Sequence, residues 1–431
     1  MSCWPPSFVI KVTEPTMPKT DRPLPLPLPT ALPAQVGWCA QRTACLLDVL
    51  QSEIERKRLP GAVVLLARHG KVALFESLGA QDPVTGKAMA KDSIFRIYSM
   101  TKPIVSVAIM MLMEQGRVML NDPVSKHLPE FADQQVAVPA DADHPPTLRP
   151  ATRPATVHDL LRHTAGLTYE FMGDSPVHSC YSQAGIGSRQ RSNAAFSTAL
   201  AALPLLADPG SMWEYSRATD VLGRLIEVLS GQTLSAFLQE KILFPLGMHE
   251  TAFSVPAAQH GRIAEPYAHD PDGGVPMPMI DIRNVAAMAS GGGGLASTAM
   301  DYARFLQFML NRGELNGVRL LGPHTVDFMT ADHLGDIAVN PAGAAPGLLP
   351  PGHGFGLGFA VRTAAGLAAV PGSVGLYYWG GIAGTTFFVD PAQDMFALMM
   401  IQAPNQREYF RPLFRNLVYA ALLDEPNLAK V

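Results

Sequence analysis

A serine and a lysine three residues apart carry the sharpest chemical signal in the sequence. Ser99 and Lys102 precede an apolar run, Ile104 to Met113, that ends before Gly116, which predicts a buried helix with the serine at its start. Positions i and i+3 of a helix share one face, so the Lys102 amine can reach the Ser99 hydroxyl. A serine attacks a carbonyl only when a neighbour takes its proton, and desolvation suits a lysine to that task. The spacing predicts a nucleophile paired with its base.

Two further sequence elements could act together with this serine–lysine pair. Tyr215 precedes a helix predicted from about 217 to 229, and a phenol next to the serine and the lysine can relay a proton. Trp379-Gly380-Gly381 lies in the strand-rich C-terminal part, where a glycine pair on an edge strand lets backbone approach a substrate and leaves an amide free to donate. Taken singly, each element has a structural explanation: Ser99 as a helix cap, Tyr215 as a packing aromatic and Trp379 as a core residue.

Composition excludes several classes of function. The chain has 431 residues, 16% of them charged, with 33 Lys and Arg against 37 Asp and Glu, so its formal net charge is −4. Such a balance excludes an electrostatic nucleic-acid binder and a disordered solvating segment. The four cysteines match no metal or redox spacing, and the 12 histidines include no H-E-x-x-H pattern. We expect no metal and no cofactor, and a small molecule rather than nucleic acid as the partner.

The sequence also predicts location. No basic segment followed by an apolar segment opens the chain, which favours a cytoplasmic protein. The longest charge-free run, 363–389, holds six glycines and Pro371, so it predicts strands and turns rather than a membrane helix.

Periodicity places strands at both ends of the chain and helices between them. A helix is predicted at about 44–58, a capping box at Thr156 to Asp159 opens a short helix, and a last helix runs from about Arg411 to Leu423 with Pro412 in its first turn. Strands are predicted at 62–68 and 72–78, joined as a hairpin, and at 355–361, 375–380, 385–389 and 395–401.

Strands at the two ends imply that the N-terminal hairpin joins the C-terminal strands in one sheet, with the active site between that sheet and a helical insertion. The predicted division is a proline-rich arm at 1–38, a discontinuous sheet domain at 39–130 and 291–431, and a mainly helical domain at 131–290, with the site in the cleft between the last two.

The set of motifs, in this order, resembles the serine β-lactamase and penicillin-binding superfamily, and more closely the family VIII carboxylesterases. The similarity extends from about Gly61 to Leu423. It is carried by SMTKP at 99, LLRHTAGLTY at 160, YSRATDVLGRLIE at 215, FPLGMHETAF at 244, GGGGLASTAMDYARF at 291, GLGF at 356 and WGG at 379.

The resemblance implies an α/β (α+β) protein with a β-lactamase-like fold, in which a mostly antiparallel sheet is flanked by helices and joined to a helical domain. It implies that Ser99 is acylated and that Lys102 and Tyr215 act as general base and acid, in an order that the sequence leaves open. It places the backbone amides of Ser99 and Ile382 in the oxyanion hole. The implied substrate-binding residues are Trp379, Gly380, Gly381 and Tyr169.

Two departures from the β-lactamase pattern bear on the substrate. Trp379-Gly380-Gly381 stands where class C β-lactamases and penicillin-binding proteins carry Lys-Thr-Gly, and Arg217 stands where they carry Asn. Loss of the lysine removes a cation that would bind a substrate carboxylate. The expected activity is hydrolysis of small neutral carboxylic esters, with weak β-lactam hydrolysis through the shared acylation machinery. Alternatives are a β-lactamase, a D-aminopeptidase or DD-peptidase, an acyltransferase and a non-catalytic scaffold of the same fold.

Two other polar residues are predicted to be structural. His163 is expected to hold loop backbone, and Asp220 to position its helix or the site. An α/β-hydrolase would need a G-x-S-x-G elbow, which the sequence lacks. Acyl-chain preference, stereoselectivity and oligomeric state have no signal in the sequence.

Overall fold

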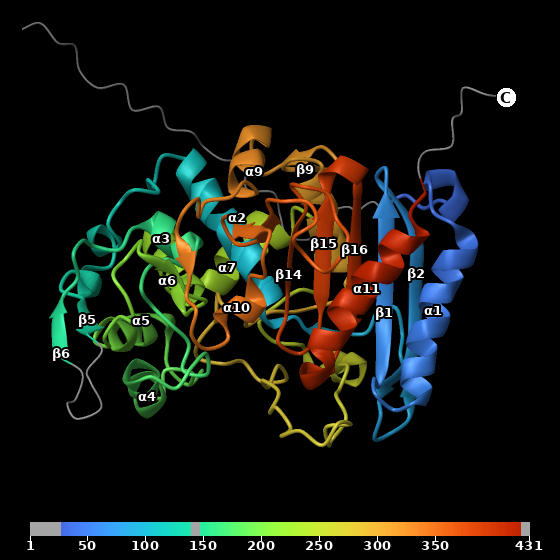
Figure 1. The fold of residues 1–431 in the computed structure, drawn as a ribbon, viewed down its shortest axis with the longest axis horizontal. Helices are drawn as coiled ribbons and strands as arrows, with labels where there is room; N and C mark the ends of the chain where they lie inside the picture. The colour runs from blue at the N-terminus through green and yellow to red at the C-terminus, as the bar shows by residue number, and fades with distance from the viewer. Residues whose placement is uncertain (1–26, 139–146, 424–431) are drawn as a thin grey trace, which may run out of the picture.

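The computed structural model describes residues 27–138 and 147–423, and Figure 1 traces its helices and strands. The helices are α1 (Ala40–Glu55), α2 (Thr101–Glu114), α3 (Val157–Leu161), α4 (Pro176–Gln183), α5 (Asn193–Ala201), α6 (Ala218–Ser230), α7 (Leu234–Leu238), α8 (Ala299–Leu310), α9 (Pro323–Met329), α10 (Ala345–Leu348) and α11 (Arg407–Ala421). The strands are β1 (Gly61–Arg68), β2 (Lys71–Asp82), β3 (Lys87–Ala88), β4 (Phe95–Arg96), β5 (Gln135–Val138), β6 (Thr147–Pro150), β7 (Met212–Trp213), β8 (Ala296–Ser297), β9 (Glu314–Leu315), β10 (Val318–Arg319), β11 (Ala338–Val339), β12 (His353–Phe355), β13 (Ala360–Arg362), β14 (Tyr377–Gly380), β15 (Thr386–Asp390) and β16 (Met395–Ile401).

Strands from both ends of the chain form one antiparallel sheet. Its order is β12-β13-β14-β15-β16-β1-β2-β3, so the N-terminal hairpin joins the C-terminal strands through the pairing of β1 with β16. The predicted architecture, a mostly antiparallel sheet with helices, is confirmed.

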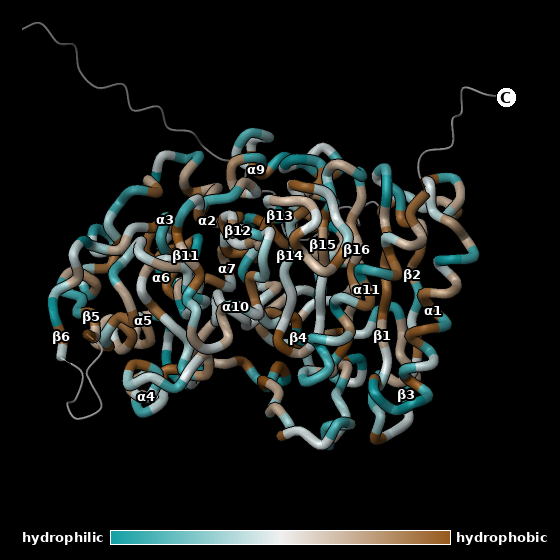
Figure 2. Tube along the Cα trace, viewed as in Figure 1, coloured by the Kyte–Doolittle hydropathy of each residue, from teal (hydrophilic) through white to brown (hydrophobic). Residues whose placement is uncertain are grey.

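Strands β1, β15 and β16 are buried along their whole length because helices cover both faces of the sheet. Val64 and Leu66 of β1 pack with α1 and α11, whereas Val63 and Leu65 belong to the larger core on the opposite face, where α8 contacts β1, β15 and β16. A strand buried on both faces reads as a continuous apolar run rather than an alternating one. In Figure 2 the central strands carry many brown, hydrophobic residues, and teal residues gather at the periphery.

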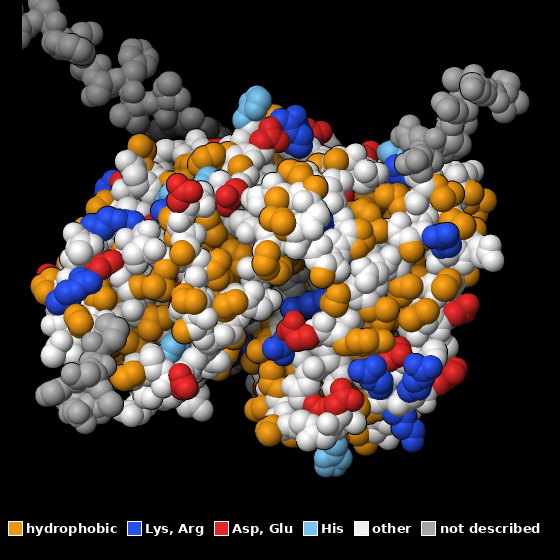
Figure 3. All heavy atoms as spheres, in the orientation of Figure 1, with side chains coloured by type: hydrophobic (Ala, Val, Ile, Leu, Met, Phe, Trp, Pro, Cys, Tyr) orange, Lys and Arg blue, Asp and Glu red, His pale blue; other side chains and the backbone are white. Residues whose placement is uncertain are grey.

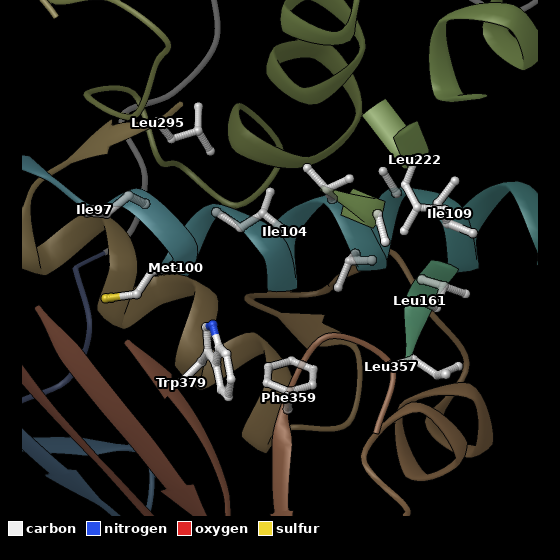
Figure 4. Close-up of a cluster of buried hydrophobic side chains, with 14 of the residues drawn as sticks. Ile97, Met100, Ile104, Ile109, Leu161, Leu222, Leu295, Leu357, Phe359 and Trp379 are labelled. Atoms are coloured by element: carbon white, nitrogen blue, oxygen red, sulfur yellow. The ribbon is translucent and has the colours of Figure 1, made fainter. Parts of the chain in front are cut away.

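Helix α2 links the sheet to the helical part. Every residue from Thr101 to Leu112 is buried, and the helix contacts α6 and α7. Figure 4 shows the apolar residues that surround it, among them Trp379 and Phe359 from the sheet side and Leu222 from α6. The residues that open α2 therefore lie where the two parts of the chain meet.

The structure corrects two predicted elements. The predicted strand at 355–361 is a hairpin, because β12 and β13 pair antiparallel and the chain turns between them. In that turn Gly358 has φ +100, and a Cβ there would lie 2.5 Å from Ser106 Oγ of α2, so the turn packs directly on that helix. The last helix begins at Arg407 rather than Arg411, and Pro412 lies inside it.

Other parts of the prediction are confirmed or stay predictions. Thr156 caps α3 with the predicted reciprocal bonds to Asp159. Residues 1–26 of the predicted arm lie outside the described residues, and the domain boundaries at 130 and 290 stay predictions. Among the residues that the structure describes, no single helix is long and apolar enough to span a membrane, although the bent pair 218–230 and 234–243 meets that test on length and composition together.

Candidate active site

Ser99 lies in a single tight turn just ahead of α2, not in the first turn of the helix itself. The turn spans Tyr98–Met100, and α2 begins at Thr101. Tyr98 has φ +44, a conformation that side chains other than glycine rarely adopt. Its phenol accepts a hydrogen bond of 2.8 Å from the amide of Ile280. The residue before the serine thus combines an uncommon backbone conformation with a side chain bound to a distant loop.

The structure brings the Lys102 amine to the Ser99 hydroxyl, as the spacing predicts. Lys102 Nζ lies 3.3 Å from Ser99 Oγ, and the lysine has no exposed surface. The same nitrogen donates to Tyr169 Oη at 3.0 Å and to the carbonyl of Gly292 at 2.6 Å. The amine is therefore fixed by three oxygen atoms from three segments of the chain.

Burial tunes this amine toward accepting a proton. Desolvation lowers the pKa of Lys102 to about 7; the carboxylate of Asp220 opposes that shift and the guanidinium of Arg217 adds to it. A charged ammonium is costly in a site without water, so the protonation equilibrium shifts toward the neutral amine. At neutral pH a large fraction of Lys102 is consequently in the form that can take a proton from a hydroxyl.

Tyr215 contacts both Ser99 and Lys102. Its phenol hydrogen-bonds with Ser99, accepts a bond of 3.2 Å from Trp379 Nε1, and has its ring centroid 4.5 Å from Lys102 Nζ. Burial raises the pKa of Tyr215, and the hydrogen bonds from Ser99 and Trp379 oppose that rise. The three residues predicted to do chemistry thus form one cluster.

His163 holds the loop that carries Tyr215, as predicted. Its Nδ1 accepts from the amide of Ser216 at 3.3 Å, and its ring centroid lies 4.9 Å from that of Tyr215. Burial and the nearby Lys102 amine keep the pKa of His163 well below its usual value. A neutral imidazole of this kind positions backbone rather than exchanging protons with the site.

Asp220 positions the segment that binds Lys102. Its Oδ1 accepts from Ser290 Oγ at 2.6 Å and from the amide of Gly292 at 2.9 Å, and the carbonyl of Gly292 in turn accepts from Lys102. A Cβ on Gly292 would lie 2.8 Å from the Asp220 carboxylate. The sequence indicates Asp220 as a positioning residue but does not indicate this carbonyl; the run Gly291 to Gly294 is its only signal.

Tyr169 contacts the predicted base. The family resemblance implies that it binds substrate, and it does line the cleft, but its phenol also binds the Lys102 amine. The guanidinium of Arg217 lies 4.6 Å from the centroid of the Tyr169 ring and pairs with Glu170 at 2.5 Å and with Asp220 at 3.5 Å. Arg217, one of the two departures from the β-lactamase pattern, is thus neutralised by two carboxylates.

The glycine pair after Trp379 brings backbone close to the serine segment. The prediction of an edge strand is wrong here, because β13 and β15 flank β14, although β13 pairs only as far as Tyr378. A Cβ on Gly381 would lie 2.5 Å from the carbonyl oxygen of Ile97, so only glycine permits this approach. The next residue, Ile382, lines the cleft beside Ser99.

A cleft of about 890 Å³ opens above these groups. Its walls include Ser99, Tyr215, Trp379 and Ile382, so both the sheet and the helical part contribute to it. Figure 3 shows the surface hollowed between those parts. A volume of this size fits a small organic ligand.

Comparisons with known proteins show the family of this chain. Residues 46–421 match the Beta-lactamase family. This chain belongs to the beta-lactamase family. It is 32% identical over 398 residues to Esterase EstB of Burkholderia gladioli, with 86% of this chain and 92% of EstB covered. The resemblance to family VIII carboxylesterases is confirmed.

Two further proteins extend the comparison of this beta-lactamase family member. Protein Rv1367c of Mycobacterium tuberculosis is 35% identical over 351 residues, covering 80% of this chain and 86% of that protein. The solved structure of "EstCE1, a hydrolase with promiscuous acyltransferase activity" superposes with a TM-score of 0.74 at 29% identity and covers 88% of this chain and 99% of that chain.

Within residues 27–138 and 147–423, no group of three or more His, Cys, Asp or Glu side chains could hold a metal ion.

The pKa of Lys102 predicts the acidic limb of the pH–rate profile. The neutral amine accumulates above about pH 7, so kcat/KM should rise as the pH increases through that value. The carboxylate of Asp220 raises the Lys102 pKa, so Asp220→Asn should move the limb to lower pH while its amide oxygen can still bind Gly292. Asp48→Asn, on α1, is the control and should leave the limb in place. An unmoved limb in Asp220→Asn would contradict this electrostatic account.

Substitution of Gly381 should impair the chemical step. An added Cβ would press on the carbonyl of Ile97 and on Thr385 Oγ1, pushing the Ile382 amide away from the serine segment. Gly381→Ala is expected to lower kcat by about 100-fold, the size of effect seen when one oxyanion donor is lost. The control is Gly261→Ala, whose Cβ would meet only the flexible Lys87 Nζ at 3.8 Å. Steady-state kinetics on a p-nitrophenyl ester measure both, and equal rates would refute the role of this approach.

Proposed function

We propose that this chain is a serine carboxylesterase that hydrolyses small carboxylic esters through an acyl-Ser99 intermediate. The observation that carries the proposal is the cluster of Ser99, Lys102 and Tyr215 at the cleft, with the buried amine 3.3 Å from the hydroxyl and the phenol hydrogen-bonded to it. The likeness to EstB, an esterase that is 32% identical over most of both chains, supports the same reaction class.

In the acylation half of the proposed reaction, Ser99 Oγ attacks the ester carbonyl carbon and its proton passes to the Lys102–Tyr215 pair. The carbonyl oxygen becomes an oxyanion, for which the amides of Ser99 and Ile382 are the proposed donors. Backbone donors fixed before the reaction stabilise such charge without rearranging. Collapse of the tetrahedral species expels the alkoxide, which takes the proton from the same pair and leaves as the alcohol.

In the deacylation half, water attacks the acyl-Ser99 carbonyl and gives its proton to the Lys102–Tyr215 pair. The serine oxygen then leaves and recovers that proton, which releases the carboxylic acid and restores the site. Both halves need a group that accepts and then returns one proton near neutral pH. The pKa of Lys102, about 7, suits that cycle.

Acyl transfer is a second candidate for the same site. EstCE1, the structural neighbour described above, is a hydrolase with promiscuous acyltransferase activity. In this reaction an alcohol replaces water in deacylation, and every proton transfer stays the same. The cleft volume of about 890 Å³ supports it, because an acceptor alcohol must fit beside the acyl group.

The weak β-lactam hydrolysis expected from the shared acylation machinery stays a prediction.

A fluorophosphonate probe tests the nucleophile. It should add once to the wild-type chain, as measured by intact mass, and not at all to Ser99→Ala. Lys102→Ala should abolish labelling and Tyr215→Phe should slow it severely. Ser106→Ala is a matched control, since Ser106 is buried two turns further along α2 and is absent from the cleft lining. Labelling that persists in Ser99→Ala would refute the proposal.

Acyl transfer is measured by partitioning. With p-nitrophenyl butyrate as donor, both reactions release p-nitrophenol, but transfer to an added primary alcohol forms a butyrate ester that chromatography separates from butyric acid. If the acyl-enzyme accepts alcohols, the share of ester should rise with alcohol concentration. The rate of p-nitrophenol release distinguishes partitioning from simple inhibition. Butyric acid as the sole product at high alcohol concentration would leave hydrolysis as the only activity.

A further inference from the structure

The cleft contains more positive charge than its carboxylates neutralise. Its charged lining residues are two glutamates and five arginines: Glu170, Glu408, Arg189, Arg217, Arg407, Arg411 and Arg415. Arg217 pairs with Glu170, and Arg407 pairs with Glu408 at 3.0 Å. Among the described residues the other three arginines form no ion pair. Figure 3 shows blue Lys or Arg side chains at this hollow.

Arg189 has the least satisfied guanidinium in the cleft. All three of its side-chain nitrogens are buried and none has a hydrogen-bond partner among the described residues. Desolvation lowers the pKa of Arg189, while the carboxylates of Asp220 and Asp281 and the phenol of Tyr98 act in the opposite direction from beyond pairing distance. Asp220 already binds Ser290, Gly292 and Arg217. A buried cation without a partner is costly, so these donors suit an anionic ligand.

Arg411 brings a second cation to the serine end of the cleft. Its Nη2 donates to the carbonyl of Gly381 at 2.5 Å, while its buried Nε has no partner in the described chain. A Cβ on Gly380 would lie 2.7 Å from that Nη2, so the guanidinium lies across the glycine pair. Arg415 differs, because its guanidinium lies 4.4 Å and 5.2 Å from the ring centroids of Tyr378 and Phe388, which accommodate it.

These positions revise the substrate expected from the sequence. The expectation of a neutral ester depended on the lysine that is missing at position 379. Cations nevertheless reach the cleft from other elements, Arg189 from the loop before α5 and Arg411 from α11. We propose that the cleft selects esters that carry a carboxylate, and that Arg189 binds this carboxylate with Arg411 as a second cation beside the glycine pair.

The proposal rests on the proposed esterase function and names its substrate class. A guanidinium matches a carboxylate with two parallel N–H···O bonds, which makes it a selective partner. Two kinds of ester present such a group: half-esters of dicarboxylic acids, with the charge on the acyl side, and esters of hydroxy acids, with the charge on the alcohol side. The chemistry at Arg189 is the same for both, and matched substrates distinguish them.

Two pairs of esters that differ only in charge test the proposal. The acyl-side pair is mono-4-nitrophenyl adipate and its methyl ester, and the alcohol-side pair is 4-butyryloxybenzoate and its methyl ester. In at least one pair the wild-type kcat/KM should favour the anion by about tenfold, the discrimination that a charge-assisted bond supplies. Arg189→Gln should remove most of that ratio, and Arg411→Gln part of it. Arg407→Gln, which removes a cation already paired with Glu408, is the matched control and should keep the ratio.

A binding measurement separates this proposal from the esterase proposal. In a Ser99→Ala background, which cannot be acylated, monomethyl adipate should bind at least about tenfold more tightly than dimethyl adipate by calorimetry, and adding Arg189→Gln should remove that difference. This readout needs no turnover, so it stands if every ester proves inert. Circular dichroism verifies that each variant is folded. Equal or weaker binding of the anion, or a preference unchanged in folded Arg189→Gln, would overturn the proposal while leaving ester hydrolysis intact.

Discussion

The burial of one amine is the constraint on which the rest of the site depends. Lys102 has no exposed surface, and a charged ammonium in such a place is stable only with partners that replace water. The carbonyl of Gly292 and the phenol of Tyr169 are two such partners. Burial also lowers the pKa of Lys102 to about 7, so part of the lysine population is uncharged at neutral pH. Burial therefore favours the neutral amine that can accept a proton from Ser99, while the two contacts fix the position of that amine.

Each partner of Lys102 is placed by a contact between distant segments. Asp220, on α6, binds the amide of Gly292, so that helix fixes the loop whose carbonyl faces the amine. On the sheet side, Gly381 packs against the carbonyl of Ile97, which joins β14 to the turn that carries the serine. Groups held by rigid elements on both sides keep their geometry while charge develops. The site belongs to the meeting of sheet and helices rather than to either part.

Local signals in the sequence predicted those features that local physics determines. The Ser99–Lys102 spacing, the Thr156 capping box and strand β16 depend on neighbours within a few residues, and the structure has all three. Features set by contacts across the fold escaped prediction. The turn at Gly358 packs directly on α2, and nothing near residue 358 in the sequence specifies that helix. The same holds for the carbonyl of Gly292.

The charge of the cleft is set by residues that the fold brings together, not by the residue at one motif position. A lysine missing from β14 indicated a neutral site, because the motif assigns that cation to one position in the sequence. The fold brings Arg411 across the same glycine pair from α11, 30 residues after Gly381, and Arg189 from the loop before α5. Arginines at the cleft also bear on the base: the guanidinium of Arg217 contributes to the low pKa of Lys102. Two sets of groups are therefore involved: burial and Arg217 favour the neutral amine of Lys102, whereas Arg189 and Arg411, which have side-chain nitrogens without partners among the described residues, are the groups proposed to bind an anionic ligand.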